Sequence, residues 1–330
     1  MKLPQIIGAD LSKKTIDFVV HSSQQHLKTS NNPGGYREFI KWMKNQKITC
    51  STVMIVMEHI GLYSHQFEQF LLHKGLTFTK VSGLAIKLSM GLIRGKSDKI
   101  DAMRIAKYGH EKSQDLVVIQ AGNETLNRMK MLHSLRERLV KNRAALMTAV
   151  KEYQEACNLK NSDIIIASQL HLIKTFSMQI AKVDDSMAEL ITTQHALKTN
   201  FDLLQSIKGV GPVLALATII KTRNFSCFTN ARKFACLCGT APFEKTSGTS
   251  IRGKTRVSHF ADKRMKTLLD LAAKSAIQYD KELKEYYRKR TQNGKSKMST
   301  INVVRNKILG RMFAVIKRQT PFVDNYLQAA

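Results

Sequence analysis

Apolar runs and amphipathic segments alternate along the first 110 residues. The apolar runs predict strands at residues 5–10, 15–21, 52–57 and 77–81. Helical spacing of apolar positions predicts helices at residues 34–45 and 63–74. The run 52–57 (TVMIVM) is almost wholly apolar, which is typical of a strand buried on both faces. This β-β-α-β-α-β order predicts an α/β domain in which helices cover the sheet.

Two long helices are predicted in the middle of the chain, at residues 124–158 and 170–197, with a turn between them. The first carries an apolar stripe near heptad spacing, formed by Leu126, Met129, Leu132, Leu135, Leu139, Leu146 and Val150. We expect an antiparallel hairpin or an intermolecular coiled coil that serves as a spacer and dimerisation arm. A second use stays open, in which basic residues contact phosphates: Arg128, Lys130, Arg136, Arg138, Lys141 and Arg143.

The last third of the chain is predicted to be mainly helical. A helix ends at Lys208, the turn Gly209-Val210-Gly211 follows, and a new helix begins at Pro212. This arrangement resembles the helix-hairpin-helix element that grips nucleic-acid backbones, since amides at a helix N-terminus suit phosphate. Lys208, Gly209 and Gly211 are therefore candidate nucleic-acid-binding residues. Further helices are predicted at residues 263–279, continuing over 280–290, and at 300–316.

Composition narrows the class of partner. The chain has 330 residues and a formal net charge of +28, which suits a polyanion, with nucleic acid ahead of an anionic membrane surface. Residues 245–318 hold 20 Lys and Arg against 5 acids, a net of +15. The longest apolar run is residues 213–220, so we expect no membrane span and no membrane partner. The start lacks a signal-peptide core, and the five cysteines are expected to be reduced thiols in the cytoplasm.

Residues 242–256 have neither helical nor strand periodicity, so the sequence predicts a loop. It places the hydroxyls of Thr246, Ser247, Thr249 and Ser250 beside the cations Lys245, Arg252, Lys254 and Arg256. Such a loop can wrap a phosphate, because Gly248 and Gly253 let the backbone approach closely. A serine in it can also act as a nucleophile if it is activated. On composition alone, phosphate binding is the simpler of the two roles.

Four acids fall where a metal site is expected. Asp10 ends the first strand and Glu58 ends the buried one, and ligands of open α/β sheets gather at strand carboxyl ends. Asp98 and Asp101 share one face of a first helical turn that Ser97 can cap. Each acid alone has an ordinary explanation as a turn, strand-end or helix-start residue. Together they form a set of oxygen ligands that suits Mg²⁺.

The motifs that carry these acids resemble those of the DEDD transposases, the Piv-like site-specific recombinases of bacterial insertion sequences. The matching stretches are Ile7–Ser12 (IGADLS), Met57-Glu58 and Lys96–Ala102 (KSDKIDA). The resemblance implies an RNase H-like (RuvC-like) first domain in which Asp10, Glu58, Asp98 and Asp101 bind Mg²⁺. A second stretch, from Gly239-Thr-Ala-Pro through Ser247-Gly248 to Lys263-Arg264, resembles the family's C-terminal transposase domain. That likeness implies that the catalytic serine is Ser247, with Ser250 as the rival.

The sequence departs from the family pattern at two places. Thr240 stands where the family usually has Leu, and residues 259–263 replace its usual Lys-x-Gly. We expect three regions: a RuvC-like catalytic domain at 1–112, a helical coiled-coil region at 113–200 and a C-terminal transposase domain at 201–330. The expected activity is cutting and rejoining of DNA strands through a Mg²⁺-assisted serine nucleophile.

The resemblance also implies partners. These are double-stranded DNA at the element ends and target, a structured noncoding (bridge) RNA as guide, and further copies of the chain. Acids of one subunit and the serine of another would form a composite site in a dimer or tetramer, working on the bacterial nucleoid.

Two alternative functions stay open. One is a metal-dependent resolvase or nuclease without a covalent intermediate, and the other is a basic architectural protein whose acids are helix caps.

Overall fold

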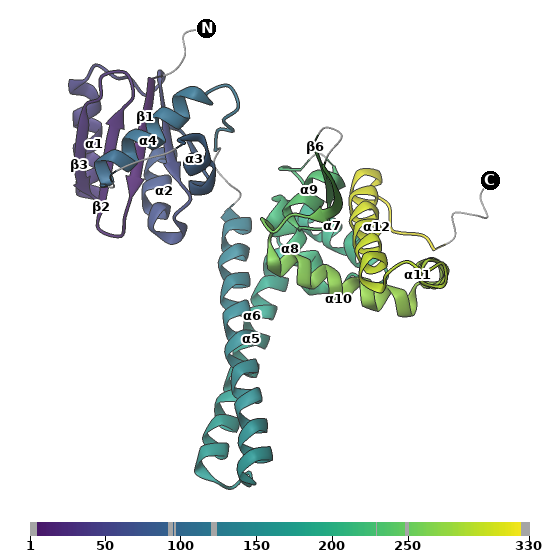
Figure 1. Cartoon of the computed structure of the whole chain (residues 1–330). Helices are drawn as coiled ribbons and strands as arrows, with labels where there is room; N and C mark the ends of the chain where they lie inside the picture. Colours follow the sequence, from purple (N-terminus) through teal and green to yellow (C-terminus); the bar gives the residue numbers. More distant parts are fainter. Residues whose placement is uncertain are drawn as a thin grey trace. The chain divides into compact units, whose positions relative to one another are not determined.

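The computed structural model describes residues 5–91, 95, 97–119, 124–228, 230–247 and 251–324. The chain divides into two compact units, Met1–Gly122 and Asn123–Ala330 (Figure 1). Each unit is a contiguous stretch of sequence with its own hydrophobic core. The finer division into regions 1–112, 113–200 and 201–330 stays a prediction.

The first unit is built on a five-stranded mixed sheet with the order β3-β2-β1-β4-β5 (Figure 1). Its strands are β1 (Gln5–Leu11), β2 (Thr15–Val20), β3 (His26–Ser30), β4 (Val53–Glu58) and β5 (Thr77–Val81). β1, β2 and β3 pair antiparallel, and β1, β4 and β5 pair parallel. The carboxyl ends of β1, β4 and β5 therefore lie at one edge of the sheet.

Helices cover both faces of this sheet. α1 (Pro33–Asn45) and α2 (His65–His73) pack on one face through Tyr36, Phe39 and Phe67, and a 3₁₀ turn, Gly61–Ser64, leads into α2. α3 (Gly83–Ser89) and α4 (Asp98–Glu111) cover the other face. Ile7 and Ala9 of β1 belong to the first core, and Ile6 belongs to the second. Because strand side chains alternate, Gly8 and Asp10 face α4.

The α/β prediction for this unit is confirmed in its strands and main helices, and it is wrong at two places. It omitted β3, because HLKTS carries a single large apolar residue, Leu27. Its backbone pairing with β2 still makes it the edge strand. It also omitted α3, which is only seven residues long and too short for helical periodicity to register.

The second unit begins with a helical hairpin. α5 (Glu124–Cys157) and α6 (Ile164–Thr192) pack against each other, joined by a six-residue turn that is shorter than the sequence predicts. Asp163 caps α6, with its side chain accepting a hydrogen bond from the Ile165 amide. Whether the pair also forms a coiled coil with another chain stays a prediction.

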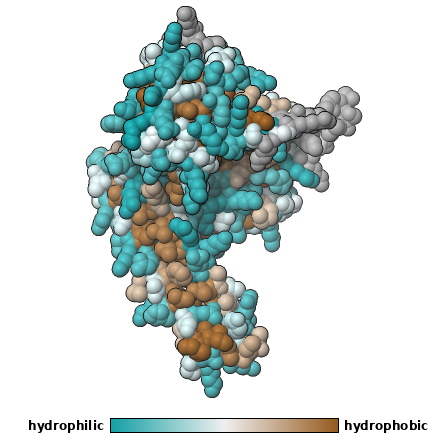
Figure 2. Space-filling view, turned by 90° about the vertical axis from the view of Figure 1, so that its left-hand side faces the viewer, coloured by the Kyte–Doolittle hydropathy of each residue, from teal (hydrophilic) through white to brown (hydrophobic). Residues whose placement is uncertain are grey.

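α6 corrects the expectation about membrane segments. By length and composition it is long and apolar enough to cross a membrane, and most of its apolar window is exposed. Counting uninterrupted runs missed it, because single polar residues such as Lys174 break a run without making the helix polar. One helix of this kind is weak evidence for a span. Figure 2 shows hydrophobic side chains along the hairpin and at its tip.

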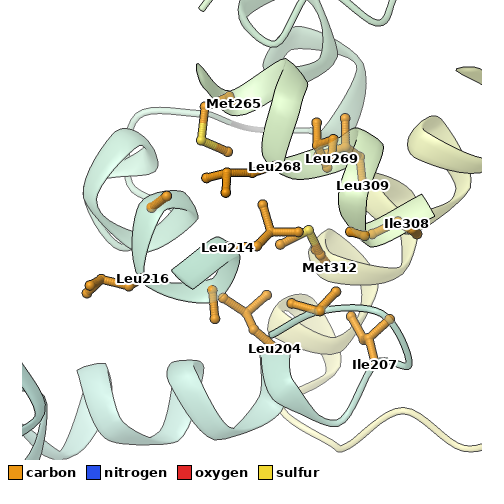
Figure 3. Close-up of a cluster of buried hydrophobic side chains, with 14 of the residues drawn as sticks. Leu204, Ile207, Leu214, Leu216, Met265, Leu268, Leu269, Ile308, Leu309 and Met312 are labelled. Atoms are coloured by element: carbon orange, nitrogen blue, oxygen red, sulfur yellow. The ribbon is translucent and has the colours of Figure 1, made fainter. Parts of the chain in front are cut away.

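The rest of the second unit is a helical core. It contains α7 (His195–Gln205), α8 (Pro212–Thr222), α9 (Ala231–Leu237), α10 (Lys263–Tyr279), α11 (Lys281–Gln292) and α12 (Lys297–Arg318). Leu204, Leu214, Leu269 and Met312 from four of these helices meet in its centre (Figure 3). α10 does not continue through residue 290 as predicted. Asp280 ends it with an extended backbone and caps α11 by accepting a hydrogen bond from the Leu283 amide.

The predicted loop at residues 242–256 is instead an antiparallel ribbon. β6 (Pro242–Ser247) pairs with β7 (Ile251–Val257), with a register shift between Phe243 and Lys245. A two-stranded ribbon can form through backbone hydrogen bonds without an apolar face, so these polar residues gave no alternating pattern to detect. The prediction of a loop here is therefore wrong, although Gly248–Ser250 at its tip lie outside the described residues.

Candidate active site

The acidic site begins with two strands that end side by side. Glu58 is the last residue of β4, and Ala9, the neighbour of Asp10, pairs with Met57 in the parallel β1–β4 ladder. Ile55 and Met57 belong to the core under α1 and α2, so alternation turns Glu58 to the face that α4 covers. Asp10 and Glu58 therefore share one face and one edge of the sheet.

α4 brings the other two acids to the same face. Ser97 caps the helix by accepting a hydrogen bond from the Ile100 amide at 3.3 Å, as the sequence predicts. Asp98 and Asp101 then occupy the first turn. The helix packs closely on β1, where a methyl group added to Gly8 would lie 2.2 Å from the carbonyl oxygen of Ala102. This glycine lets the acidic turn approach the strand that carries Asp10.

The electrostatics of Asp10 show that the acids are neighbours. Its pKa is raised from 3.8 to about 6, first by burial and then by the charges of Asp101, Asp98, Asp17 and Glu58. Like charges favour the protonated form, and burial removes the water that would screen them. All four predicted acids therefore contribute to one local field. A divalent cation bound among them would offset that repulsion, so the donor set fits a hard metal ion.

Asp101 and Asp98 each contact a basic side chain, and Glu58 packs against a glycine. Arg104 donates to Asp101 from Nη1 at 2.8 Å and to the Gly95 carbonyl oxygen from Nη2 at 2.9 Å. Lys28 donates to Oδ2 of Asp98 at 3.3 Å. The Glu58 carboxylate lies against Gly83, where an added methyl group would be 2.0 Å from Oε1. Among the residues that the structure describes, no three His, Cys, Asp or Glu side chains converge closely enough to hold a metal ion in this arrangement.

The sequence analysis missed a group of polar residues beside the acids. Asp17 of β2 is buried and lies opposite Asp10 in the β1–β2 register. His26 contacts its Oδ1 at 2.7 Å through Nε2, and Lys28 contacts its Oδ2 at 3.3 Å. A signal was present, since Asp17 interrupts an otherwise apolar strand (TIDFVV) and a buried carboxylate needs a partner. Finding the partners required β3, which the sequence did not reveal.

The second predicted centre, around Ser247, lies in the other unit. Ser247 is the last residue of β6 and pairs with Ile251 at the end of the ribbon. The side chains of Ser247, Lys245, Arg252 and Lys254, and all of Ser250, lie outside the described part of the structure. Arg256 is exposed on β7, opposite Phe243. The structure therefore gives the backbone of this centre and leaves the roles of these side chains as predictions.

The start of the ribbon is anchored in the helical core. Thr240, two residues before β6, is fully buried. Its carbonyl oxygen accepts hydrogen bonds from Nδ2 of Asn302 at 2.9 Å and of Asn306 at 3.0 Å, both on α12. Its hydroxyl contacts Oδ1 of Asn306 at 3.2 Å. Thr240, the residue that departs from the family pattern, is thus part of the attachment of the ribbon to α12.

The predicted backbone-binding turn also lies in the second unit. α7 ends at Gln205 and α8 begins at Pro212, and the turn between them borders a groove of about 480 Å³ against α10. Gly209 has φ +90° and packs on Ala272, whereas Gly211 has open space around it. Lys208 forms an ion pair with Asp324. Gly211 is exposed and Gly209 is packed against α10, and contact of this turn with nucleic acid stays a prediction.

Comparison with known proteins gives two family matches. Residues 7–153 match the DEDD transposase family of IS110 type, and residues 201–288 match the Transposase IS116/IS110/IS902 family. The first match spans all four candidate acids and the second spans Ser247. The first also confirms the RNase H-like fold expected for the N-terminal domain.

Three relatives agree with these matches. The pilin gene-inverting proteins of Moraxella bovis and Moraxella lacunata are each 26% identical over 332 residues, covering 96% of this chain and 97% of the relative. A putative transposase of Sinorhizobium fredii (strain NBRC 101917 / NGR234) is 23% identical over 266 residues, covering 73% of this chain and 65% of the relative. The similarity to the two Moraxella proteins therefore extends through both units.

Proposed function

Because this chain belongs to the IS110-type family of DEDD transposases, which are DNA recombinases, we propose that it cuts and rejoins DNA through the side chain of Ser247. In this proposal Asp10, Glu58, Asp98 and Asp101 hold a divalent metal, Mg²⁺. The observation that carries the metal set is geometric, because Asp10 and Glu58 end neighbouring strands on the face where the first turn of α4 places Asp98 and Asp101. Burial and four neighbouring acids raise the pKa of Asp10, which agrees with this arrangement. An isolated helix-capping acid would not experience such a field.

Each part of the chain has a role in this mechanism. The hydroxyl oxygen of Ser247 attacks the scissile phosphorus, the bond to the departing strand breaks, and a transient phosphoserine forms. This linkage conserves the energy of the phosphodiester, so a second strand can be joined without an external energy source. Asp10, Glu58, Asp98 and Asp101 would hold the cation, and its charge would offset their repulsion and attract the phosphate. The acids would in this way determine where the phosphate is held.

Basic residues near the ribbon are proposed to hold the DNA backbone. Lys245, Arg252, Lys254 and Arg256 belong to β6 and β7, in a quarter of the chain with a net charge of +15. Lys208, Gly209 and Gly211 border the groove against α10, where amides at the start of α8 suit a phosphate. Charge of this size also suits a structured guide RNA, which we include in the proposal as a second polyanion.

Self-association is proposed to occur through the α5–α6 hairpin. Large apolar side chains are exposed along it, including Met147, Ile164, Leu172 and Met178. A second copy of the hairpin would cover them, giving a dimer or tetramer in which acids and serine come from different subunits. Insertion of α6 into a membrane is the alternative, and a vesicle-flotation experiment tests it: the proposal expects the full chain to stay unbound to vesicles.

A covalent-trapping assay tests the proposed chemistry. The full chain is incubated with Mg²⁺, the DNA ends of its element and co-purifying RNA, and then separated on a denaturing gel. We expect a protein–DNA adduct that is lost in Ser247→Ala and in Asp101→Asn. An adduct that survives Ser247→Ala but disappears in Ser250→Ala would move the nucleophile by three residues. Cleaved DNA without any adduct would instead support a hydrolytic resolvase, and unchanged activity in the acid variants would support an architectural protein.

A further inference from the structure

Lys28 joins two carboxylates from different elements of the first unit. Its Nζ lies 3.3 Å from Oδ2 of Asp17 on β2 and 3.3 Å from Oδ2 of Asp98 at the start of α4. Leu27 belongs to the core under α1, so alternation along β3 turns Lys28 to the α4 face, where the four candidate acids lie. A cationic side chain is thus built into the edge of the acidic site.

The two carboxylates hold Lys28 in different ways. The Asp17 side chain is 4% exposed and also contacts His26, so it is a fixed anchor. The Asp98 side chain is 61% exposed, and within the described part of the first unit Lys28 is the cation that contacts it. An exposed ion pair of this kind is weak and exchanges readily. The contact with Asp98 is therefore the one that can be given up.

From this geometry we infer that Lys28 is the built-in counter-charge of the acidic site, and that a divalent cation must displace its ammonium group from Asp98 in order to bind. The inference rests on the proposed metal set of Asp10, Glu58, Asp98 and Asp101. Lys28 acts through Asp98 in this scheme and is not itself a ligand of the metal. It also reduces the affinity for cations, because two positive charges compete for one carboxylate.

The arrangement also explains how the repulsion between the acids is partly offset when no metal is bound. Asp101 is paired with Arg104 and Asp98 with Lys28, so two of the four carboxylates already have a cationic partner. Removing Lys28 takes away the competing charge and keeps all four proposed ligands. We therefore expect metal binding to become tighter, whereas the loss of a metal ligand would make it weaker.

The test is a titration of the full chain with Mn²⁺, followed by electron paramagnetic resonance of the free ion. Lys28→Met and Lys28→Gln are expected to bind Mn²⁺ about three- to tenfold more tightly than the wild type, since the side chain is half exposed and its charge is partly screened. Lys28→Arg keeps the charge and should bind like the wild type. Lys44→Met makes the same change in net charge on α1, which covers the opposite face of the sheet, and should also bind like the wild type.

The outcomes separate this inference from the proposed function. If Asp101→Asn abolishes Mn²⁺ binding but Lys28→Met binds as the wild type does, or more weakly, the role of Lys28 is overturned and the metal set stands. If the wild type binds no Mn²⁺, or Asp101→Asn binds normally, the metal set fails and the inference fails with it. A crystal structure of the wild type soaked in Mn²⁺ needs no variant. Lys28 should then lie beyond hydrogen-bond distance of Asp98, and an intact contact beside a bound ion would contradict the inference.

Discussion

Gly8 of β1 and Ala102 of α4 are in such close contact that a methyl group on Gly8 would lie 2.2 Å from the Ala102 carbonyl oxygen. The same methyl group would lie 2.4 Å from the backbone nitrogen of Ala106. Both obstacles are backbone atoms, so no side-chain rotation can relieve the overlap. The distance between the helix that carries two of the acids and the strand that carries Asp10 is therefore set by a residue without a side chain.

Gly8→Ala should displace α4 from the sheet. We expect a loss of about 3 kcal/mol in the free energy of unfolding of the first unit, because overpacking against backbone cannot relax. Mn²⁺ binding should fall with it, since Asp98 and Asp101 move with the helix. Urea denaturation and a Mn²⁺ titration measure the two effects. Gly310→Ala on α12, where a methyl group meets nothing within 4 Å, is the matched substitution and should leave both unchanged or slightly raise stability.

The raised pKa of Asp10 predicts that the contribution of this group to the stability of the metal-free protein falls as the pH rises. In the folded chain this carboxyl group has a pKa of about 6, against an ordinary value of 3.8. Between these values it binds more protons in the folded state than in the unfolded state, so its contribution to the free energy of unfolding falls with pH and levels off above 6. Asp10→Asn should remove this dependence and stabilise the protein at pH 7 in EDTA by about 1–2 kcal/mol, after allowance for screening. A pH series of thermal melts of the wild type and Asp10→Asn tests this prediction. If the stability of the two proteins changes with pH in the same way between pH 4 and 6, the prediction is contradicted.

The two glycines of the turn before α8 should respond differently to alanine. Gly209 has φ +90°, and a methyl group there would lie 2.6 Å from the Ala272 carbonyl oxygen. Gly209→Ala should therefore lower the stability of the second unit by about 2–4 kcal/mol, from backbone strain and overlap together. A methyl group added to Gly211 meets nothing within 4 Å, so Gly211→Ala should leave the melting temperature unchanged. Equal melting temperatures for the two variants would show that the turn does not pack on α10 as described.

Thr240→Val should loosen the anchor of the β6–β7 ribbon while keeping the shape of the side chain. The substitution removes the hydroxyl group that contacts Oδ1 of Asn306, and it leaves that oxygen without this partner in a buried site. We expect a loss of about 1–2 kcal/mol in the free energy of unfolding. Thr240→Ser retains the hydroxyl group and should restore most of the loss. Amide hydrogen exchange of residues 243–247 would report the loosening of the ribbon directly.

The fold of the first unit could be predicted from the sequence wherever burial left a pattern. Residues 52–57 (TVMIVM) are almost wholly apolar because β4 is an interior strand covered on both faces, and Ser97 marks the start of α4 because a helix needs a cap. β3 could not be predicted in this way, because an edge strand is held by backbone pairing with β2 and buries little. Lys28 and His26 were missed for the same reason, and with them the partners of Asp17.

In the second unit, the features that could not be predicted from the sequence have other physical causes. The ribbon of β6 and β7 leaves no alternating pattern, because its backbone bonds do not depend on side-chain polarity. The break at Asp280 needs a side chain that both ends one helix and caps the next, which periodicity alone does not detect. Pro212 gave the start of α8 correctly, because proline fits the first helical position.

The boundary at Gly122 and Asn123 has a consequence for synthesis. All five strands of the sheet and the helices that bury its faces precede this boundary, so nothing in the later chain is needed to complete the first core. Domains that are contiguous in sequence fold as units, N-terminal first, while the ribosome is still at work. The nascent chain can therefore complete the domain that carries the four candidate acids before its most basic quarter, residues 245–318, leaves the ribosome.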